Sequence, residues 1–340
     1  MLFRSPLMGG ASANLPEGTQ ISYSTDGGQS WREEAPFLTD AGTLEYLVRA
    51  QNRNYETAQA QGSLTVGKRS ILLTSADAEK EYDGTPLTTA DAPDQGVTVS
   101  GDGFVTGEGA SFEATGSQLI VGESANTFNY TFNAGTKADN YDVQVQEGTL
   151  RVTDRTGKYE IVLRAMGGEF MYDGTEKRSE GFEESIFTLN GNTYTVSGVE
   201  ASAAGTAAGT YPMEISGEAR VADAAGNDVT PQFEVTAESA NLTILKRSLE
   251  ISSASASKQY DGRPLNTLGQ ENQGITVSGD GFAAGEGADY EVTGSQTAAG
   301  SSLNSFRTVF RQGTDAANYN LTEKPGTLTV VNRDSKYSIT

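Results

Sequence analysis

The strongest constraint on this chain is an internal repeat. Lys68-Arg69-Ser70 recurs 178 residues later as Lys246-Arg247-Ser248, and the segments 68–153 and 246–331 align without a gap. In this alignment 45 of the 86 positions are identical. Chance does not produce such a match, so the two segments are copies of one domain. A chain of this kind folds as a series of small units rather than around one large core.

Recurring motifs also set the other domain boundaries. Residues 155–245 carry their own Tyr172-Asp173-Gly174 and form a divergent repeat, whereas residues 1–67 lack this motif and predict a domain without its N-terminal strands. Lys336-Tyr337-Ser338-Ile339 resembles the opening of the divergent repeat, so we expect the chain to be an internal piece of a longer protein. The predicted domains are 1–67, 68–154, 155–245 and 246–332, followed by the start of a further repeat at 333–340.

The sequence of each repeat predicts short strands separated by turns. In the stretch 127–133, Phe128, Tyr130 and Phe132 alternate with polar residues, which predicts a strand with one apolar face. Tyr130 is replaced by threonine in the second copy, so the two phenylalanines are the expected core positions. Asp-Gly pairs suit tight turns, and no stretch has helical periodicity with caps. We therefore predict an all-β fold of tandem Ig-like β-sandwich domains in an extended array. The alternative is a β-grasp repeat, which needs a helix against the sheet.

Composition excludes several classes of function. The 340 residues contain neither histidine nor cysteine, which removes disulfides, Ser-His-Asp triads and the usual zinc sites. Lys and Arg number 24 against 45 Asp and Glu, a net charge of −21, so a nucleic-acid partner is not expected. No apolar run approaches the roughly 18 residues of a membrane helix, so we expect no membrane insertion in this segment. We also expect no cofactor.

Three motifs resemble a known family. They are Tyr-Asp-Gly-Thr-Pro-Leu at 82–87, Ser-Gly-Asp-Gly-Phe at 100–104 and Gly-Thr-Leu-Arg-Val at 148–152. They resemble the YDG/MBG-type Ig-like repeats of large bacterial surface proteins and adhesins, and the segment 23–56 resembles a module that often neighbours such repeats. The divergent repeat departs from the pattern because Tyr172-Asp173-Gly174 is not followed by Pro-Leu.

The resemblance implies an extracellular protein on a bacterial cell surface, and it brings no catalytic residues. We therefore expect a non-enzymatic stalk or spacer of an adhesin, whose partners are the neighbouring repeats of the same chain. One alternative is a module that binds carbohydrate or mucin, with a host glycan or mucin as partner. A second alternative is an accessory region of a secreted glycoside hydrolase, because paired carboxylates can perform that chemistry without histidine or cysteine.

Four carboxylates are candidate metal ligands. Asp102 with Glu108, and Asp280 with Glu286, lie in glycine-rich loops whose oxygens could hold calcium. Two carboxylates fall short of the six to eight oxygens that calcium takes, so turn chemistry is the favoured interpretation.

Aromatic residues supply the candidate ligand contacts. Tyr23 and Trp31, on the two arms of a predicted hairpin, could contact sugar, but a stabilising cross-strand pair is the favoured interpretation. The tyrosines of the Tyr-Asp-Gly motifs recur in every complete unit, which favours a structural role over a sugar platform. They are Tyr82, Tyr172 and Tyr260.

A lysine–asparagine crosslink is a further possibility that the sequence raises. Lys68 and Lys246 open the two copies, and Asn140 and Asn318 precede late strands. Exposed linker lysines and turn asparagines are the favoured interpretation, because lysine is rarely buried without a partner.

Overall fold

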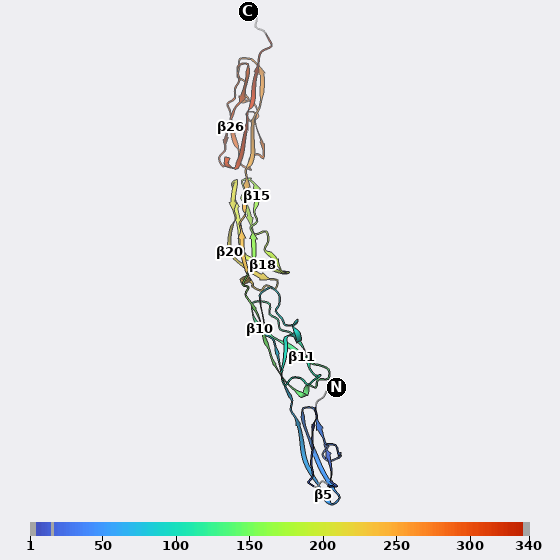
Figure 1. Cartoon of the computed structure of the whole chain (residues 1–340). Helices are drawn as coiled ribbons and strands as arrows, with labels where there is room; N and C mark the ends of the chain where they lie inside the picture. The colour runs from blue at the N-terminus through green and yellow to red at the C-terminus, as the bar shows by residue number, and fades with distance from the viewer. Residues whose placement is uncertain (1–4, 15–16, 336–340) are drawn as a thin grey trace, which may run out of the picture. The chain divides into compact units, whose positions relative to one another are not determined.

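The computed structural model describes residues 5–14 and 17–335. The chain divides into two compact units, Met1–Gly157 and Lys158–Thr340. We divide the chain into a first (1–67), second (68–154), third (155–245) and fourth (246–332) module. Each unit contains two of them, except that residues 155–157 belong to the first unit. Figure 1 colours the modules in chain order from blue to red. Among the described residues every strand pairs within its own module, and regular structure besides strands is limited to short 3-10 turns. The described part of the chain has no helix that could span a membrane.

The second module is a β-sandwich built from three small sheets. The sheet β12-β6-β8 packs on the pair β11-β9, and β10-β13-β7 continues the structure beyond them. The strands are β6 (Arg69–Ser75), β7 (Ala78–Glu81), β8 (Val97–Gly101), β9 (Ala110–Ala114), β10 (Gly122–Asn126), β11 (Phe128–Phe132), β12 (Tyr141–Gln146) and β13 (Gly148–Thr153), with 3-10 turns η1 (Pro93–Gly96) and η2 (Ala138–Asn140).

The core of the second module lies between these sheets. Ile71 and Leu73 of β6 are fully buried and pack with Val97, Tyr141 and the partly buried Phe128. Period-two alternation therefore predicted the buried face of β11 correctly. Tyr130, on the same strand, is 37% exposed, in agreement with its replacement in the second copy.

The first two strands of the second module pair in parallel with its last two. Arg69 lies opposite Tyr141 at the start of β6, and Glu81 lies opposite Thr153 at the end of β7. The register is the same along both ladders, so the chain enters at one end of the module and leaves at the other. Thirteen extended residues at about 3.3 Å each place these two ends roughly 40 Å apart. We call them the entry pole and the exit pole.

A buried polar cluster fastens the point where β6 continues into β7. The Ser75 hydroxyl donates to the Asn126 carbonyl (2.6 Å) and accepts from the Gly148 N–H (2.9 Å), and the Asn126 amide donates to the Ala76 carbonyl (2.8 Å). A Cβ on Gly148 would lie 2.5 Å from the Ser75 carbonyl oxygen, so only glycine fits here. This contact explains why Gly148 recurs as Gly326 in the repeat.

The fourth module repeats this architecture. Its sheets are β25-β23-β29, β24-β30-β27 and β26-β28, and β23 and β24 pair in parallel with β29 and β30. The strands are β23 (Arg247–Ser253), β24 (Ala256–Gln259), β25 (Ile275–Gly279), β26 (Ala288–Val292), β27 (Gly300–Asn304), β28 (Phe306–Phe310), β29 (Tyr319–Lys324) and β30 (Gly326–Val331), with turns η4 (Glu271–Gly274) and η5 (Ala316–Asn318).

The third module keeps the parallel ladders but enlarges one sheet. β14 pairs with β21 and β15 with β22, whereas the long strands β18 and β20 form an antiparallel pair (Figure 1). The strands are β14 (Tyr159–Arg164), β15 (Gly168–Met171), β16 (Lys177–Glu180), β17 (Ile186–Leu189), β18 (Asn192–Gly205), β19 (Gly209–Pro212), β20 (Glu214–Asp223), β21 (Phe233–Glu238) and β22 (Asn241–Leu245), with turn η3 (Thr230–Gln232).

The first module is simpler. Its sheets β2-β4-β5 and β1-β3 are antiparallel, and its core is Tyr23, Tyr46 and Leu64. Among the described residues, no strand runs parallel to its last strand. The strands are β1 (Leu7–Met8), β2 (Gln20–Ser24), β3 (Phe37–Leu38), β4 (Gly42–Asn52) and β5 (Tyr55–Val66).

The structure confirms the predicted all-β, Ig-like sandwich class and contains no helix of the kind that a β-grasp unit needs in the described residues. The strand predicted at 127–133 is present as β11. The sequence pattern predicts no strand at β7 or β10, which have four and five residues and no β-branched residue. Residues 336–340, where a further repeat is predicted to begin, lie outside the described residues.

Substitution of Gly326 tests the fastening of the parallel ladders. A Cβ there would lie 2.5 Å from the Ser253 carbonyl oxygen, and overpacking of this kind typically costs about 1–3 kcal/mol. We expect Gly326→Ala to speed hydrogen exchange in peptides of β29 and β30, measured by mass spectrometry on the full chain. Gly269→Ala is the control, because that position has open space around it. Equal exchange in the two variants would contradict the assignment.

Candidate functional site at the module junctions

The contact between the third and fourth modules centres on Tyr172. This residue follows β15 at the exit pole of the third module and is only 5% exposed. Its ring packs with Leu249, Ala283 and Tyr319 of the fourth module, and the Tyr172 and Tyr319 rings meet edge to face with centroids 5.8 Å apart. The tyrosine of the Tyr-Asp-Gly motif therefore belongs to a core shared by two modules.

Glu286 joins the two tyrosines. The Tyr172 hydroxyl donates to one oxygen of this carboxylate and the Tyr319 hydroxyl donates to the other. Burial, together with the hydrogen bond to the Glu286 carboxylate, raises the pKa of each tyrosine to about 12. Charge-assisted hydrogen bonds of this kind are roughly twice as strong as neutral ones.

Two further hydrogen bonds hold the same junction. The buried Asn318 side-chain oxygen accepts from the Ala208 N–H (2.8 Å), and the Arg247 guanidinium donates to the Tyr172 carbonyl (3.2 Å). Thus the exit pole of the third module offers two donors, the Tyr172 hydroxyl and the Ala208 N–H, and one acceptor, the Tyr172 carbonyl. The entry pole of the fourth module supplies the matching acceptors and donor.

The junction between the first and second modules uses the same asparagine position. The Asn140 side-chain oxygen accepts from the Ala41 N–H (2.6 Å), and its amide donates to the Asp40 carboxylate (2.9 Å), which also binds Lys137 (2.6 Å). Tyr141 donates to Glu108 on its own module. No tyrosine of the first module enters this junction among the described residues, and a cavity of about 470 Å³ lies there, lined in part by Ala41, Phe104 and Asn140.

The four candidate calcium ligands have two different environments. The Asp102 and Asp280 carboxylates accept from the Ser70 and Ser248 N–H groups (2.8 and 2.7 Å) and so fasten the strand that opens each copy. Glu108 and Glu286 accept from tyrosines instead, as described above. Within the described residues, no three acidic side chains gather as a metal site would require. The interpretation as turn residues therefore fits Asp102 and Asp280. Glu108 and Glu286 instead bind tyrosine hydroxyls at the ends of their modules.

The aspartate of each Tyr-Asp-Gly motif binds a lysine of its own module. The pairs are Lys80–Asp83 (2.8 Å), Lys177–Asp173 (2.5 Å) and Lys258–Asp261 (2.7 Å). Hydrogen bonds from Lys177 and Thr175 lower the pKa of Asp173, and Lys258 lowers that of Asp261. These pairs close the turn beside each tyrosine.

The structure gives no support to a lysine–asparagine crosslink. Lys68 and Lys246 are exposed, as the favoured interpretation predicted. Asn140 and Asn318 are buried and bound to the preceding module, so they are not simple turn residues.

The predicted pairing of Tyr23 with Trp31 is wrong. Tyr23 pairs with Arg32, so Trp31 is one residue out of register and points to the other face. Tyr23 is buried in the core against Tyr46, whereas Trp31 donates to the Gly28 carbonyl (3.0 Å) and has the Arg49 guanidinium 4.3 Å from its ring centre. One face of Trp31 is thus covered by a cation, and Tyr23 is only 8% exposed.

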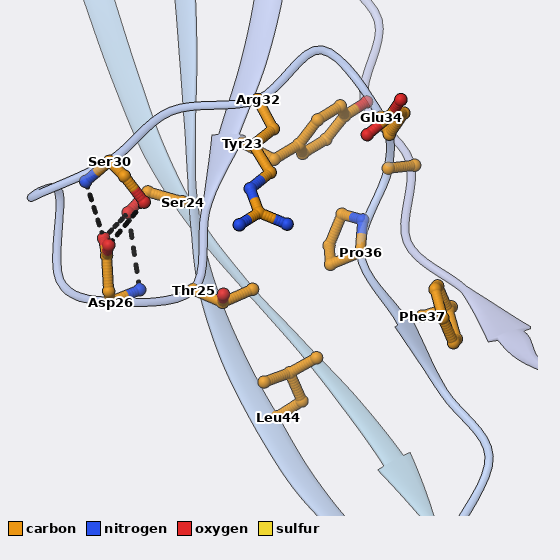
Figure 2. A pocket seen from close by; sticks show the side chains of 11 residues that line it. Tyr23, Ser24, Thr25, Asp26, Ser30, Arg32, Glu34, Pro36, Phe37 and Leu44 are labelled. Carbon is orange, nitrogen blue, oxygen red and sulfur yellow. Dashed lines mark hydrogen bonds between the residues drawn. The ribbon is translucent and has the colours of Figure 1, made fainter.

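A hollow of about 350 Å³ lies on the Tyr23 side of the first module (Figure 2). The Arg32 guanidinium points into it and has no protein partner among the described residues. Asp26 lines one side, and hydrogen bonds from Ser24 and Ser30 lower the pKa of its carboxyl. Pro36 and Phe37 line the other side, and Phe37 is 59% exposed. Sequence reasoning missed Arg32 and Phe37, because neither belongs to a motif.

Comparison with known proteins adds little beyond the fold. No family model matches the chain, and no curated protein matches it. Among solved structures, Drosophila N-cadherin EC1-4 is 9% identical with a TM-score of 0.21, over 95% of this chain and 94% of that one. The protocadherin gammaB4 extracellular domain is 11% identical with a TM-score of 0.24, over 96% and 60%. A Bacteroides ovatus surface protein, SGBP-B of a mixed-linkage glucan utilization locus, is 12% identical with a TM-score of 0.12, over 97% and 65%. At these scores the likeness does not extend to a ligand or partner.

Tyrosine titration tests the Glu286 bridge. A phenol whose pKa is raised from 10 to about 12 stabilises the junction fully below pH 10, and this contribution is lost as the pH rises through 12. We expect Glu286→Gln to lower the pH at which Tyr172 and Tyr319 ionise, measured by phenolate absorbance. Glu271→Gln, at an exposed site in the same module, should leave the titration unchanged; a Glu286→Gln curve that superimposes on the original would refute the bridge.

Proposed function

We propose that this chain is a non-enzymatic spacer segment of an extracellular bacterial surface protein of the YDG/MBG-type repeat class. The observation that carries the proposal is the pair of parallel ladders in each complete module. The chain enters and leaves each module at opposite ends, so every module adds length between its neighbours. The motifs at 82–87, 100–104 and 148–152 support the family assignment.

The parallel ladders also suit a chain under tension. When the two ends of such a module are pulled apart, the first and last strands slide past each other along their length. The ladder hydrogen bonds then share the load and must break together, whereas bonds at the open end of an antiparallel pair break one at a time. The second module has ten residue pairs in its two parallel ladders.

Charge and junction contacts support the same role. Residues 68–153 carry five basic and 13 acidic side chains. Like-charged surfaces repel within a Debye length of about 8 Å at physiological salt, which keeps such modules soluble. The hydrogen bonds from the Ala41 N–H to Asn140 and from the Ala208 N–H to Asn318 limit bending inside each unit.

Single-molecule pulling on the full chain tests the spacer. We expect three strong unfolding events, each lengthening the chain by about 260 Å, the difference between about 85 extended residues and a folded module of roughly 40 Å. The first module, which lacks a parallel ladder among the described residues, should open at lower force. Gly326→Ala should weaken one strong event and leave two. Uniformly weak events would refute the mechanical role.

The hollow of the first module supports a second candidate function, binding of a neutral saccharide. Arg32 offers several donors there, and Asp26 and Glu34 offer acceptors of opposite charge, which suits the paired hydroxyls of a sugar better than an anion. The exposed Phe37 ring and Pro36 provide an apolar wall. This hollow, which Tyr23 also lines, replaces the Tyr23–Trp31 pair as the carbohydrate candidate.

A glycan array probed with the full chain tests this candidate. We expect binding to a neutral oligosaccharide, with at least a tenfold loss in Arg32→Gln, since a lost hydrogen bond to a charged group is worth about 1.5–3 kcal/mol. Phe37→Ala should also weaken binding, because it removes the aromatic part of the apolar wall. Arg53→Gln, an exposed arginine elsewhere in the module, is the control. An array without signal would leave the spacer as the only supported function.

A further inference from the structure

The entry poles of the second and fourth modules share five side chains but carry opposite charges at one neighbouring position. Lys137, just before η2, is replaced in the fourth module by Asp315, just before η5. Both poles therefore offer a preceding module the same asparagine, tyrosine and glutamate beside a different charge. The shared residues are Arg69, Phe104, Glu108, Asn140 and Tyr141 in the second module and Arg247, Phe282, Glu286, Asn318 and Tyr319 in the fourth.

The modules that precede these poles also differ at the position that faces this charge. In each, a glycine opens a strand that pairs antiparallel with the last strand, and the alanine before it donates its N–H to the asparagine of the next module. The residue before the alanine is Asp40 in the first module and Ala207 in the third. Equivalent positions thus carry a carboxylate in one module and a methyl group in the other. The alanine–glycine pairs are Ala41-Gly42 and Ala208-Gly209.

Asp40 and Lys137 meet across the junction of the first and second modules. The Asp40 carboxylate accepts from the Lys137 ammonium (2.6 Å) and from the amide of the buried Asn140 (2.9 Å). In the fourth module the Asp315 carboxylate accepts from the Ala317 N–H of its own turn (2.9 Å). A carboxylate at position 207 would therefore take the place of Asp40 with an aspartate, and not a lysine, on the facing turn.

We propose that residue 137 or 315 selects the preceding module that an entry pole accepts. With Lys137, the pole of the second module takes a neighbour that presents a carboxylate. With Asp315, the pole of the fourth module takes an uncharged neighbour and rejects an acidic one. The hydrogen bond from an alanine N–H to the asparagine is common to both junctions, so it positions the neighbour, whereas the charge discriminates between neighbours.

Repulsion of the wrong neighbour carries more of this selection than attraction of the right one. The Lys137 and Asp40 side chains are 62% and 41% exposed, and an ion pair at such exposure stabilises little. Asp40 is nevertheless held in place by the buried Asn140, so an aspartate at position 137 would meet a fixed like charge at close range. Like charges placed in this way are a common means of excluding wrong partners.

Exchange of two backbone amides measures the two junctions separately in the full chain. The Ala41 N–H donates to Asn140 and the Ala208 N–H to Asn318, so each exchanges when its own junction opens. Mass spectrometry with electron-transfer fragmentation resolves both amides. In Lys137→Asp we expect Ala41 exchange to become about threefold faster or more, because attraction becomes repulsion, and Ala208 exchange to stay unchanged. Sodium chloride at about 1 M, where the Debye length is about 3 Å, should reduce the effect.

Further substitutions distinguish selection by charge from a loss of structure. Adding Asp40→Lys to Lys137→Asp should slow Ala41 exchange again, since opposite charges then face each other once more. Asp139→Ala is the control, because it also gives the second module the residue that the fourth has in the same turn, and it should not speed exchange. Exchange in β6 and β13 shows whether the second module remains folded.

The reciprocal substitutions give the fourth module an acidic neighbour. We expect Ala207→Asp to speed Ala208 exchange. Asp315→Asn, which keeps an oxygen for the Ala317 N–H, should reduce this effect, and Asp315→Lys should remove it. Ala208 exchange that follows position 207 alone, whatever residue stands at 315, would overturn the proposal. So would Ala41 exchange that ignores Lys137→Asp, or that Lys137→Asp speeds equally at low and high salt.

This inference deepens the spacer function and rests on it, because a fixed order of neighbours matters only where modules hold one another. The two can fail separately. Three strong unfolding events in a chain whose amide exchange ignores residues 137 and 315 would retain the spacer and lose the selection. Uniformly weak unfolding events with the expected exchange would do the reverse.

Discussion

Parallel pairing of the first two strands with the last two is the constraint on which each complete module depends. Parallel strands cannot be joined by a short hairpin, so everything between them must fold as one long connection around the core. In the second module that connection supplies β8 to β11 and carries the Phe112 and Phe128 side chains that cover Ile71 and Leu73. The ladders therefore form only when the whole module has folded. They join the first two strands to the last two, and they leave the points where the chain enters and leaves at opposite poles.

The switch from β6 to β7, and from β12 to β13, makes this arrangement possible. Each strand crosses from one sheet to another at the same level, where Gly148 approaches the Ser75 carbonyl more closely than any Cβ would allow. Ser75 and Asn126 satisfy the backbone groups that the crossing would otherwise leave unpaired in the interior. The fourth module uses Ser253 and Asn304 in the same way.

Contacts at the junctions connect neighbouring modules within a unit. Tyr172 leaves its own sheet and completes a core with Leu249 and Tyr319, and the Glu286 carboxylate satisfies both phenols. A partly buried carboxylate without partners would be costly, so Glu286 and Tyr172 of the neighbouring module depend on each other. Where the preceding module has no tyrosine at this place, as in the junction of the first and second modules, a cavity lies beside Asn140 instead.

The sequence by itself determined the repeats, the all-β class, the turns and the apolar face of β11, because these depend on local pattern. The comparison of the two copies also separated Phe128 from Tyr130 on that face. It also led to the expectation of a structural role for Tyr82, Tyr172 and Tyr260. Only the tertiary structure decided the parallel pairing, the register that separates Tyr23 from Trp31, and the partners of Glu286 and Asn318. The reason is that hydrogen bonds across 33 to 114 residues depend on which strands meet, and nothing in the residues near either partner specifies that.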